Sequence, residues 1–487
     1  PGHIVVSVVD EAGQGIANVR VYMFNDKGRY QGRYGNTDHQ GKLIFEDAPD
    51  GRYQFRANYH TNRFWSDPIS WPAEWHAVIE TGQRPFTVHV VDNEDVGINN
   101  VRVHAFNEKN HYTGVYGNTN DQGEMVLKLA DGRYQFRANY QTRQYWSDTA
   151  ESPDVKEATV QTGQRPFTVH VIDNAGVGIN NVRVYAFNEN GRYTGVYGNT
   201  NDAGQLVLNL ADGALKFRAH YQTNQYWSDV VTSPTVVEAA VQTGQRPFTV
   251  HVVDAAGNGL ANVRVYAFNE NGRYIGVYGN TGSNGQLSLN LADGAFKFRA
   301  NYQTNQYWSD TVTSPNVTEA VVKTGQQTLT VSVVDNAGQG IANVRVYAFN
   351  ENGRYTGVYG NTNNDGQVAL ELGEGNFKFR ADYQSRAYWS DVIAAPQTTE
   401  TAVKTGQRPF TISVVDNAGN GLANVRVYAF NENGRYTGAY GNTAANGQVT
   451  LNLADGNLKF RARYSGTQHW SDVVNSPGTN TAVVTTN

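Results

Sequence analysis

The chain has 487 residues, a formal net charge of −5 and no cysteine. A slightly acidic chain without a basic stripe lacks the electrostatic signature of a nucleic-acid-binding protein, and the absence of cysteine excludes disulfides and thiol chemistry. No apolar stretch approaches the roughly 18–20 residues of a membrane-spanning helix. We therefore expect no nucleic acid among the partners and no membrane span.

One phrase, an aromatic residue followed by Trp-Ser-Asp, recurs every 81 residues. Its tryptophans are Trp65, Trp146, Trp227, Trp308, Trp389 and Trp470. A fixed long period with Gly-rich turns between short apolar runs indicates tandem domains. The predicted repeats are residues 1–83, 84–164, 165–245, 246–326, 327–407 and 408–487. The first repeat carries one extra residue, between Asn36 and Asp50.

The third repeat shows the elements that all six share. Strands are predicted over residues 166–173, 181–187, 192–198, 205–210, 214–221, 226–229 and 236–242. Phe167, Val169 and Val171 alternate strictly with polar residues, which is typical of a half-buried strand, and Asn190-Gly191 is a hairpin signal. Seven short strands separated by turns predict an all-β, immunoglobulin-like sandwich in each repeat, with Trp227 filling the core.

The connection between repeats is short. After Thr162-Gly163-Gln164 the next strand begins at Arg165-Pro166, and this tether leaves little slack because proline fixes φ. We expect six tandem seven-stranded sandwiches in an extended rod of roughly 200 Å, from the rise per residue of a strand.

A longer pattern of turn and core residues covers most of every repeat. It reads V-x-D-x-x-G-x-G-I-x-N-V-x-V-x-A-F over residues 171–187, followed by Asn199-Thr200, Asp212-Gly213 and Phe217-Arg218-Ala219. This pattern resembles the carboxypeptidase-regulatory-like and Cna-B-like β-sandwich modules, which share a transthyretin-like topology. The resemblance implies the fold, and it implies a place among microbial surface adhesins and extracellular fibre proteins.

One departure from Cna-B-like modules concerns lysine. Such modules often carry a Lys–Asn isopeptide bond, but the first strand has no lysine in any repeat. The strand lysines Lys216, Lys297, Lys378 and Lys459 are replaced by Gln54 and Gln135 in the first two repeats. We expect no internal isopeptide bond.

Metal and catalytic chemistry find little support in the sequence. Asp173, Asp202 and Asp229 lie at predicted turns, where oxygen-rich loops could hold Ca²⁺, but no calcium-loop spacing is present and aspartate commonly caps turns. The prediction is therefore no cofactor, with calcium as an alternative. His170 recurs in only some repeats and has no consistent nucleophile as partner, so no enzyme is predicted.

The 29 tyrosines and 20 phenylalanines are more than six small cores can hold. By strand alternation Tyr193, Gly195 and Tyr197 share one face, which leaves an open gap between two rings. We interpret Tyr193 and Tyr197 as candidate surface contacts for packing between subunits. The alternatives are stacking of sugar rings and an ordinary solvated sheet with cross-strand tyrosine pairs.

The first repeat alone contains two further tryptophans, Trp71 and Trp75. Terminal repeats are often atypical because they cap an array, but tryptophan is also enriched at interface hot spots. Trp71 and Trp75 are therefore candidate subunit-docking residues. Asn316-Val317-Thr318 is a candidate N-glycosylation site.

Together these features predict a non-enzymatic structural subunit of a microbial extracellular fibre or surface filament. The subunit would self-associate end to end or laterally, at the cell surface, with covalent glycans as an option. A contact that continued the internal stacking of repeats would be heterologous and would not close, which yields a filament. The alternative function is an adhesin stalk or a carbohydrate-binding array that presents tyrosine-rich faces to polysaccharide.

Overall fold

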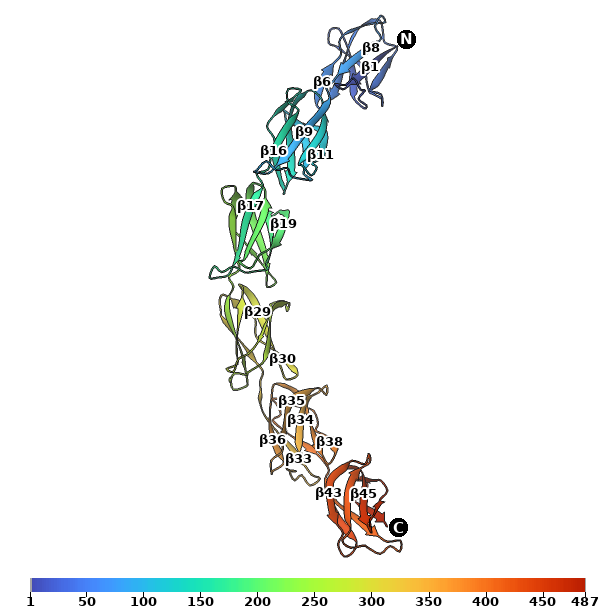
Figure 1. The fold of residues 1–487 in the computed structure, drawn as a ribbon, viewed down its shortest axis with the longest axis vertical. Coiled ribbons are helices and arrows are strands. Elements are labelled where there is room, and N and C mark those ends of the chain that lie inside the picture. Colours follow the sequence, from blue (N-terminus) through green and yellow to red (C-terminus); the bar gives the residue numbers. More distant parts are fainter. Residues whose placement is uncertain (1, 487) are drawn as a thin grey trace. The chain divides into compact units, whose positions relative to one another are not determined.

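The computed structural model describes residues 2–486, and every regular element within that range is a β-strand (Figure 1). The third repeat contains β17 (Arg165–Ile172), β18 (Arg183–Asn188), β19 (Tyr193–Asn199), β20 (Gln205–Leu210), β21 (Gly213–Tyr221), β22 (Asn224–Trp227), β23 (Val231–Ser233) and β24 (Glu238–Gln242). No helix in residues 2–486 is long and apolar enough to cross a membrane.

The other five repeats contain the same eight strands in the same order. The first has β1 (His3–Val9), β2 (Arg20–Asn25), β3 (Tyr30–Asn36), β4 (Lys42–Glu46), β5 (Gly51–Tyr59), β6 (Asn62–Trp65), β7 (Ile69–Trp71) and β8 (His76–Glu80). The second has β9 (Arg84–Val91), β10 (Arg102–Asn107), β11 (Tyr112–Asn118), β12 (Glu124–Leu129), β13 (Gly132–Tyr140), β14 (Arg143–Trp146), β15 (Ala150–Ser152) and β16 (Glu157–Gln161). The fourth has β25 (Arg246–Val253), β26 (Arg264–Asn269), β27 (Tyr274–Asn280), β28 (Gln286–Leu291), β29 (Gly294–Tyr302), β30 (Asn305–Trp308), β31 (Val312–Ser314) and β32 (Glu319–Lys323). The fifth has β33 (Gln327–Val334), β34 (Arg345–Asn350), β35 (Tyr355–Asn361), β36 (Gln367–Leu372), β37 (Gly375–Tyr383), β38 (Arg386–Trp389), β39 (Ile393–Ala395) and β40 (Glu400–Lys404). The sixth has β41 (Arg408–Val415), β42 (Arg426–Asn431), β43 (Tyr436–Asn442), β44 (Gln448–Leu453), β45 (Gly456–Tyr464), β46 (Thr467–Trp470), β47 (Val474–Ser476) and β48 (Thr481–Thr485).

Each repeat is a sandwich of one three-stranded and one five-stranded sheet. In the third repeat the smaller sheet has the order β20-β17-β24, and the larger has the order β19-β18-β21-β22 with β23 also pairing with β21. Only β17 and β24 run parallel; the other pairs are antiparallel. The all-β sandwich fold expected from the sequence is confirmed in all six repeats.

Alternation along the strands fills the space between the two sheets. Phe167 of β17 stacks on Phe217 of β21 with ring centroids 5.1 Å apart, and both side chains are fully buried. Val169, Val184 and Ala219 complete the same layer. Because side chains alternate with a period of two, Arg218 must leave the core face where Phe217 enters it.

The predicted place of Trp227 is wrong. Its side chain is 42 % exposed and lies on the outer face of the five-stranded sheet, where its ring is 5.0 Å from that of Phe187. The reason is strand register: Tyr226 pairs with core-facing Ala219, so Trp227 pairs with outward-facing Arg218. The structure also adds an eighth strand, β23, to the seven that the sequence predicted.

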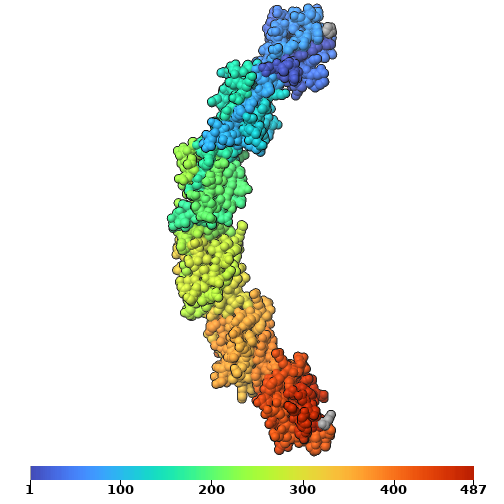
Figure 2. Space-filling view, viewed as in Figure 1, coloured from blue at the N-terminus to red at the C-terminus, as the bar shows by residue number. Residues whose placement is uncertain are grey.

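By the contacts between its residues the chain divides into two units, Pro1–Gly244 and Gln245–Asn487. Each unit holds three repeats, and each repeat is a compact body in the space-filling view (Figure 2). Strands β9, β17, β25, β33 and β41 start at the first residue of the second to sixth predicted repeats.

The two extra tryptophans of the first repeat have different environments. Trp71 is buried in the core of that repeat, and its Nε1 donates a hydrogen bond to the carbonyl oxygen of Ala48 at 2.9 Å. Trp75 lies in the loop after β7 and is 47 % exposed. Trp71 is therefore unavailable for docking, which corrects half of the predicted pair, while docking by Trp75 stays a prediction.

Replacing these two tryptophans should have opposite effects on the stability of the first repeat. Trp71→Ala removes a buried ring, and we expect it to lower the free energy of unfolding by about 3–5 kcal/mol. Trp75→Ala should change it by less than about 0.5 kcal/mol. Amide hydrogen exchange of β1 in the full chain, followed against urea concentration, measures both. Equal effects of the two changes would contradict the assignment of Trp71 to the core.

Candidate functional site

Consecutive repeats within each unit meet at a joint. At the joint between the second and third repeats, the tip of the β13–β14 hairpin, residues 141–142, contacts the turn between β20 and β21, residues 211–212. The same arrangement recurs between the first and second repeats of the first unit, and at both corresponding boundaries in the second unit. The four joints are therefore the recurring contacts between neighbouring repeats.

A glutamine side chain closes three of the four joints with two hydrogen bonds. Gln141 Nε2 donates to the carbonyl oxygen of Asn209 at 2.9 Å, and Gln141 Oε1 accepts from the amide of Ala211 at 2.9 Å. Gln303 and Gln384 bind the next repeat in the same way. We call this pair of hydrogen bonds the amide clamp, since one side chain satisfies both a donor and an acceptor of the neighbouring turn.

A tyrosine hydroxyl adds a second contact at the same three joints. Tyr145 OH donates to the carbonyl oxygen of Asp212 at 2.7 Å, and Tyr307 and Tyr388 do the same to Glu374 and Asp455 at 2.7 and 2.8 Å. Burial raises the pKa of the Tyr388 hydroxyl to about 12. The hydroxyl is therefore protonated, and able to donate, throughout the physiological pH range.

The linker itself takes part in the joint. The carbonyl oxygen of Thr162 accepts a hydrogen bond from the amide of Asp212 at 3.0 Å, and Thr162 is almost fully buried. Gly163 follows with φ of +65°, and a Cβ there would lie 2.0 Å from Asp212 Oδ2. Only glycine fits both the left-handed backbone and the close carboxylate.

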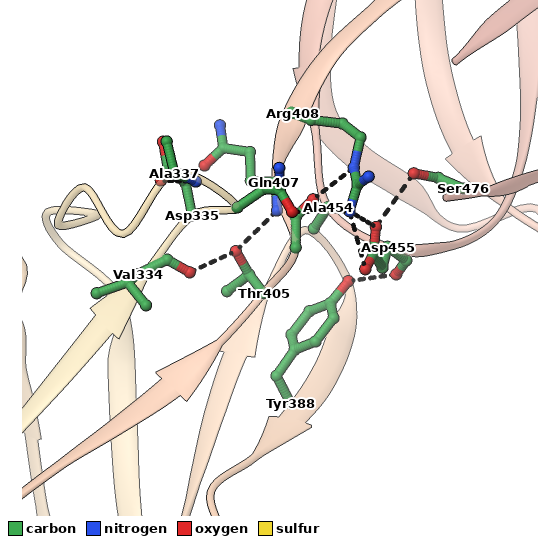
Figure 3. A network of polar contacts seen from close by, with 12 residues as sticks. Val334, Asp335, Ala337, Tyr388, Thr405, Gln407, Arg408, Ala454, Asp455 and Ser476 are labelled. Atoms are coloured by element: carbon green, nitrogen blue, oxygen red, sulfur yellow. Dashed lines mark hydrogen bonds and ion pairs between the residues drawn. The ribbon is translucent and has the colours of Figure 1, made fainter. Parts of the chain in front are cut away.

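Charged groups surround the linker. Arg165, the first residue of β17, forms an ion pair with Asp212, with Nε and Oδ1 3.2 Å apart. The equivalent pair of Arg408 and Asp455 is drawn in Figure 3, together with Ser476 Oγ, which donates to Asp455 Oδ1 at 3.2 Å. These contacts hold the start of each new repeat against its own turn, so the linker has bonded partners on both sides.

The first joint replaces both clamp residues. His60 occupies the position of Gln141, and its Nδ1 accepts from the amide of Ala130 at 3.3 Å. Phe64 occupies the position of Tyr145, and Asn62 Nδ2 instead donates to the carbonyl oxygen of Asp131 at 3.1 Å. Burial lowers the pKa of His60 to about 4, so its ring is neutral near pH 7 and able to accept.

The hairpin of the sixth repeat and the receiving turn of the first repeat differ from their counterparts at the joints. In the sixth repeat Ser465 and His469 stand where the hairpins of the second, fourth and fifth repeats have glutamine and tyrosine, so this repeat carries no amide clamp. In the first repeat, Trp71 Nε1 donates to the carbonyl oxygen of Ala48 and Tyr53 OH donates to that of Pro49. The bond from Trp71 sets this turn apart, since Tyr134 OH donates to the carbonyl oxygen of Ala130 in the second repeat as Tyr53 OH does to Pro49.

The second recurring feature is the outer face of each five-stranded sheet. In the third repeat, Tyr185 lies 5.9 Å from Tyr193 and 5.7 Å from Tyr197 between ring centroids. The guanidinium carbon of Arg218 lies 4.8 Å from the ring centre of Phe187 and 5.5 Å from that of Trp227. We call this cluster, with Arg183 over Tyr197 at 5.0 Å, the aromatic–arginine face.

The sequence-predicted surface tyrosines both belong to this face. Tyr193 and Tyr197 are 40 % and 53 % exposed, and Tyr185 of β18 lies beside both rings. Sequence alternation found these two rings on β19 but missed Arg218 and Trp227, because these lie on neighbouring strands. The recurrence of Arg218 beside Phe217 in every repeat was the signal that could have shown them. Any partner of Tyr193 and Tyr197 stays a prediction.

The structure does not bring the candidate calcium ligands together. Asp173 Oδ1 accepts from the amides of Ala175 and Val177, both at 2.8 Å, which is the ordinary role of aspartate in a turn. Within residues 2–486, no group of three or more His, Cys, Asp or Glu side chains could hold a metal ion. His170 faces outward and lies 3.3 Å from Glu238, Nε2 to Oε2.

The remaining sequence candidates lie at the surface. Asn316 is exposed in the turn after β31, where a glycan would have room, and its modification stays a prediction. Lys216 Nζ lies 4.9 Å from the ring centre of Trp227 on the outer face. This lysine therefore points away from the sandwich core.

No protein-family model and no curated protein matches the chain. Among solved structures, the chain is similar to the Bacillus anthracis TIE protein, at 13 % identity over 82 % of this chain and 73 % of that chain, with a TM-score of 0.19. It is also similar to GBS52, the minor pilin of Streptococcus agalactiae, at 14 % identity over 33 % of this chain and 94 % of that chain, with a TM-score of 0.22.

A third similar structure contains two B repeat units of the collagen-binding protein Cna of Staphylococcus aureus. The identity is 12 % over 66 % of this chain and 98 % of that chain, with a TM-score of 0.16. These solved structures include the Cna B-type repeats named by the sequence resemblance. The fold of each repeat follows from its own sheet topology.

The first joint should be more acid-sensitive than the joint between the second and third repeats. His60 has a pKa of about 4 in the closed joint against about 6.5 in an open chain. Above pH 6.5 both states are neutral and the joint keeps its full stability. As the pH falls from 6.5 towards 4, only the open state binds a proton, so the closed joint loses up to about 3 kcal/mol.

Amide hydrogen exchange of Ala130 at pH 7 and pH 4.5, corrected for the intrinsic rate, measures this loss. His60→Gln installs the residue of the other joints and should abolish the pH dependence. The amide of Ala211, which faces Gln141, serves as the internal control. Equal acid sensitivity at Ala130 and Ala211 would show that His60 is not its source.

Shortening one clamp residue should open one joint. Gln384→Asn keeps a residue that tolerates the positive φ of 45° at this position but shortens the side chain by one methylene group. Because two hydrogen bonds of about 1 kcal/mol each are lost, exchange of the Ala454 amide should accelerate about thirtyfold. Gln468→Asn, at an exposed position of the sixth repeat, is the matched control. Unchanged exchange at Ala454 would contradict the clamp.

Proposed function

We propose that the chain is a non-enzymatic structural protein of a microbial cell surface or extracellular fibre. The observation that carries this proposal is the joint: within each unit, every boundary between repeats is closed by side-chain and backbone hydrogen bonds around a three-residue linker. Such a boundary suits a protein whose task is to keep successive domains at a fixed spacing. An enzyme would need one asymmetric site, whereas the joints and the outer sheet faces recur along the chain.

An extracellular location agrees with the composition. The chain has no cysteine and only two methionines, so it offers little oxidisable sulfur. One methionine, Met125, is buried in the core of the second repeat, and the other, Met23, in the first. Exposed threonines and the exposed Asn316 would accept glycans without disturbing a core.

Self-association into a polymer is the second part of the proposal. A contact between chains needs a surface that the internal joints leave open. Trp75 is the best candidate for such a contact, since it is a large exposed aromatic side chain beside His76, with ring centroids 5.6 Å apart. Aromatic residues of this kind are frequent interface hot spots.

Negative-stain electron microscopy of the purified full chain tests the proposal. We expect filaments, and we expect Trp75→Ala to shorten or abolish them without unfolding the first repeat, because the ring contributes nothing to its core. Val96→Ala, which changes an exposed apolar residue of the second repeat, is the control. A parallel sample with a chelator tests the calcium alternative, since loss of filaments there would require a bound cation.

Particles that never associate at any concentration would contradict the polymer. The chain would then act as a spacer or stalk. If Trp75→Ala leaves the filaments unchanged, the contact between chains lies on another surface.

A further inference from the structure

The aromatic–arginine face recurs in every repeat, yet the joints do not use it. Its six copies share an outer tyrosine that is 53–56 % exposed and a tryptophan that is 38–45 % exposed. These tyrosines are Tyr34, Tyr116, Tyr197, Tyr278, Tyr359 and Tyr440. A sheet whose only task was to cover its own core would not need large exposed rings at the same positions six times.

The face carries positive charge on a chain that is negative overall. In the third repeat the outward positions of β18, β19, β21 and β22 include Arg183, Lys216 and Arg218 and no carboxylate. The chain as a whole has a net charge of −5. The face therefore complements an anion, whereas two copies of the same face would repel each other.

The central arginine is held in place by the rings with hydrogen-bonding capacity to spare. Arg218 lies over Tyr185, Phe187 and Trp227, and its buried Nε has no acceptor among residues 2–486. The same is true of Nε of Arg56, Arg137, Arg299, Arg380 and Arg461. Stacking fixes the plane of a guanidinium group, and its planar fork of N–H donors matches a carboxylate.

The fifth repeat shows that a carboxylate fits there. Asp382 occupies the position of His220 and forms an ion pair with Arg380. Nη2 donates a hydrogen bond to Oδ2 at 3.1 Å, and Nε lies 2.9 Å from Oδ1 without making a hydrogen bond. Asn58, Asn139, Asn301 and Arg463 occupy this position elsewhere. One repeat therefore supplies from its own chain the group that the other five lack.

The exposed rings indicate what such an anion would be attached to. Tyr193, Tyr185 and Tyr197 present ring surfaces on both sides of the gap at Gly195, where a Cβ would meet no atom within 4 Å. The C–H faces of sugar rings pack against aromatic rings, and a polymer of similar units would meet the same face once per repeat. Weak binding at several repeats would add up through effective concentration.

We propose that the aromatic–arginine face binds carboxylated polysaccharides, with sugar rings on the tyrosines and a carboxylate on the central arginine. The first, second, third, fourth and sixth repeats bind the polysaccharide. The fifth does not, because Asp382 already occupies its arginine. This inference does not depend on the proposed fibre function, since it concerns a face that the joints leave open.

Binding of polygalacturonate to the full chain, measured by isothermal titration calorimetry, tests the proposal. The methyl ester of the same polymer is the matched probe without charge, and we expect its affinity to be lower by about tenfold or more because the carboxylate–guanidinium contacts are lost. Equal affinity for the polymer and its ester would overturn the role of the arginine.

Two sets of protein variants sharpen this test. Replacing Arg56, Arg137, Arg218, Arg299 and Arg461 by Gln should weaken binding by about tenfold or more. Replacing the same number of exposed turn arginines by Gln should leave most of the binding affinity. That control set is Arg29, Arg192, Arg273, Arg354 and Arg435. Equal loss in both sets would show attraction by general charge alone and would overturn the proposal.

Single changes in the fifth repeat keep the test valid where the fivefold variant does not fold. Asp382→Asn frees Arg380 and should raise the number of bound sites from five to six, whereas Arg380→Gln should leave binding unchanged. Unchanged stoichiometry with Asp382→Asn would contradict the assignment.

Two other occupants are distinguished by the same proteins. If single-stranded oligothymidylate binds more tightly than polygalacturonate, the ligand of the face is a nucleic acid and the proposal is wrong. If the fivefold variant changes only self-association, measured by sedimentation without polysaccharide, the face packs copies of the chain and the proposal is wrong.

Discussion

Three of the four joints share one interaction, a side-chain amide that satisfies both a donor and an acceptor of the next repeat. Gln141 reaches the turn at Ala211 from a hairpin tip with positive φ, and the buried Thr162 carbonyl oxygen accepts from that turn as well. A three-residue linker alone would limit how far two domains separate but would leave them free to rotate. The clamp removes that freedom because its two hydrogen bonds act away from the linker.

The two faces of the five-stranded sheet have separate tasks because of strand alternation. Phe217 faces the core, and its neighbour Arg218 faces the outer rings. The core can therefore stay the same in all repeats while the outer face and the hairpin tips vary. Asp382 in the fifth repeat and His60 in the first are such variations. Neither touches the stacked phenylalanines that hold the sandwich together.

Periodicity made the fold predictable from the sequence. The 81-residue repeat, the alternating apolar runs and the Asn-Gly turns located seven of the eight strands, and the missing strand, β23, has only three residues. Trp227 was placed wrongly because the hairpin between β21 and β22 sets its register, and a tryptophan near a strand end carries no alternation of its own. Trp71 was misread because its hydrogen-bond partner, Ala48, lies 23 residues away.

The joints could not be predicted for a related reason. Gln141 and Ala211 are 70 residues apart, and the glutamine stands in a loop where polar residues are ordinary. Comparison between repeats carries the missing information. Glutamine and tyrosine recur at the hairpin tips of the repeats whose joints are closed by the clamp, while Ser465 and His469 replace them in the sixth.

Residues that vary at a position where other repeats agree mark the places where the array changes its properties. At His60 the change replaces an amide that does not titrate by a ring that does. At Ser465 it removes the clamp, and at Asp382 it supplies a carboxylate to an arginine that is otherwise open. In a protein built from copies, function beyond the shared fold is therefore found by reading the differences between the copies against the contacts that the common residues make.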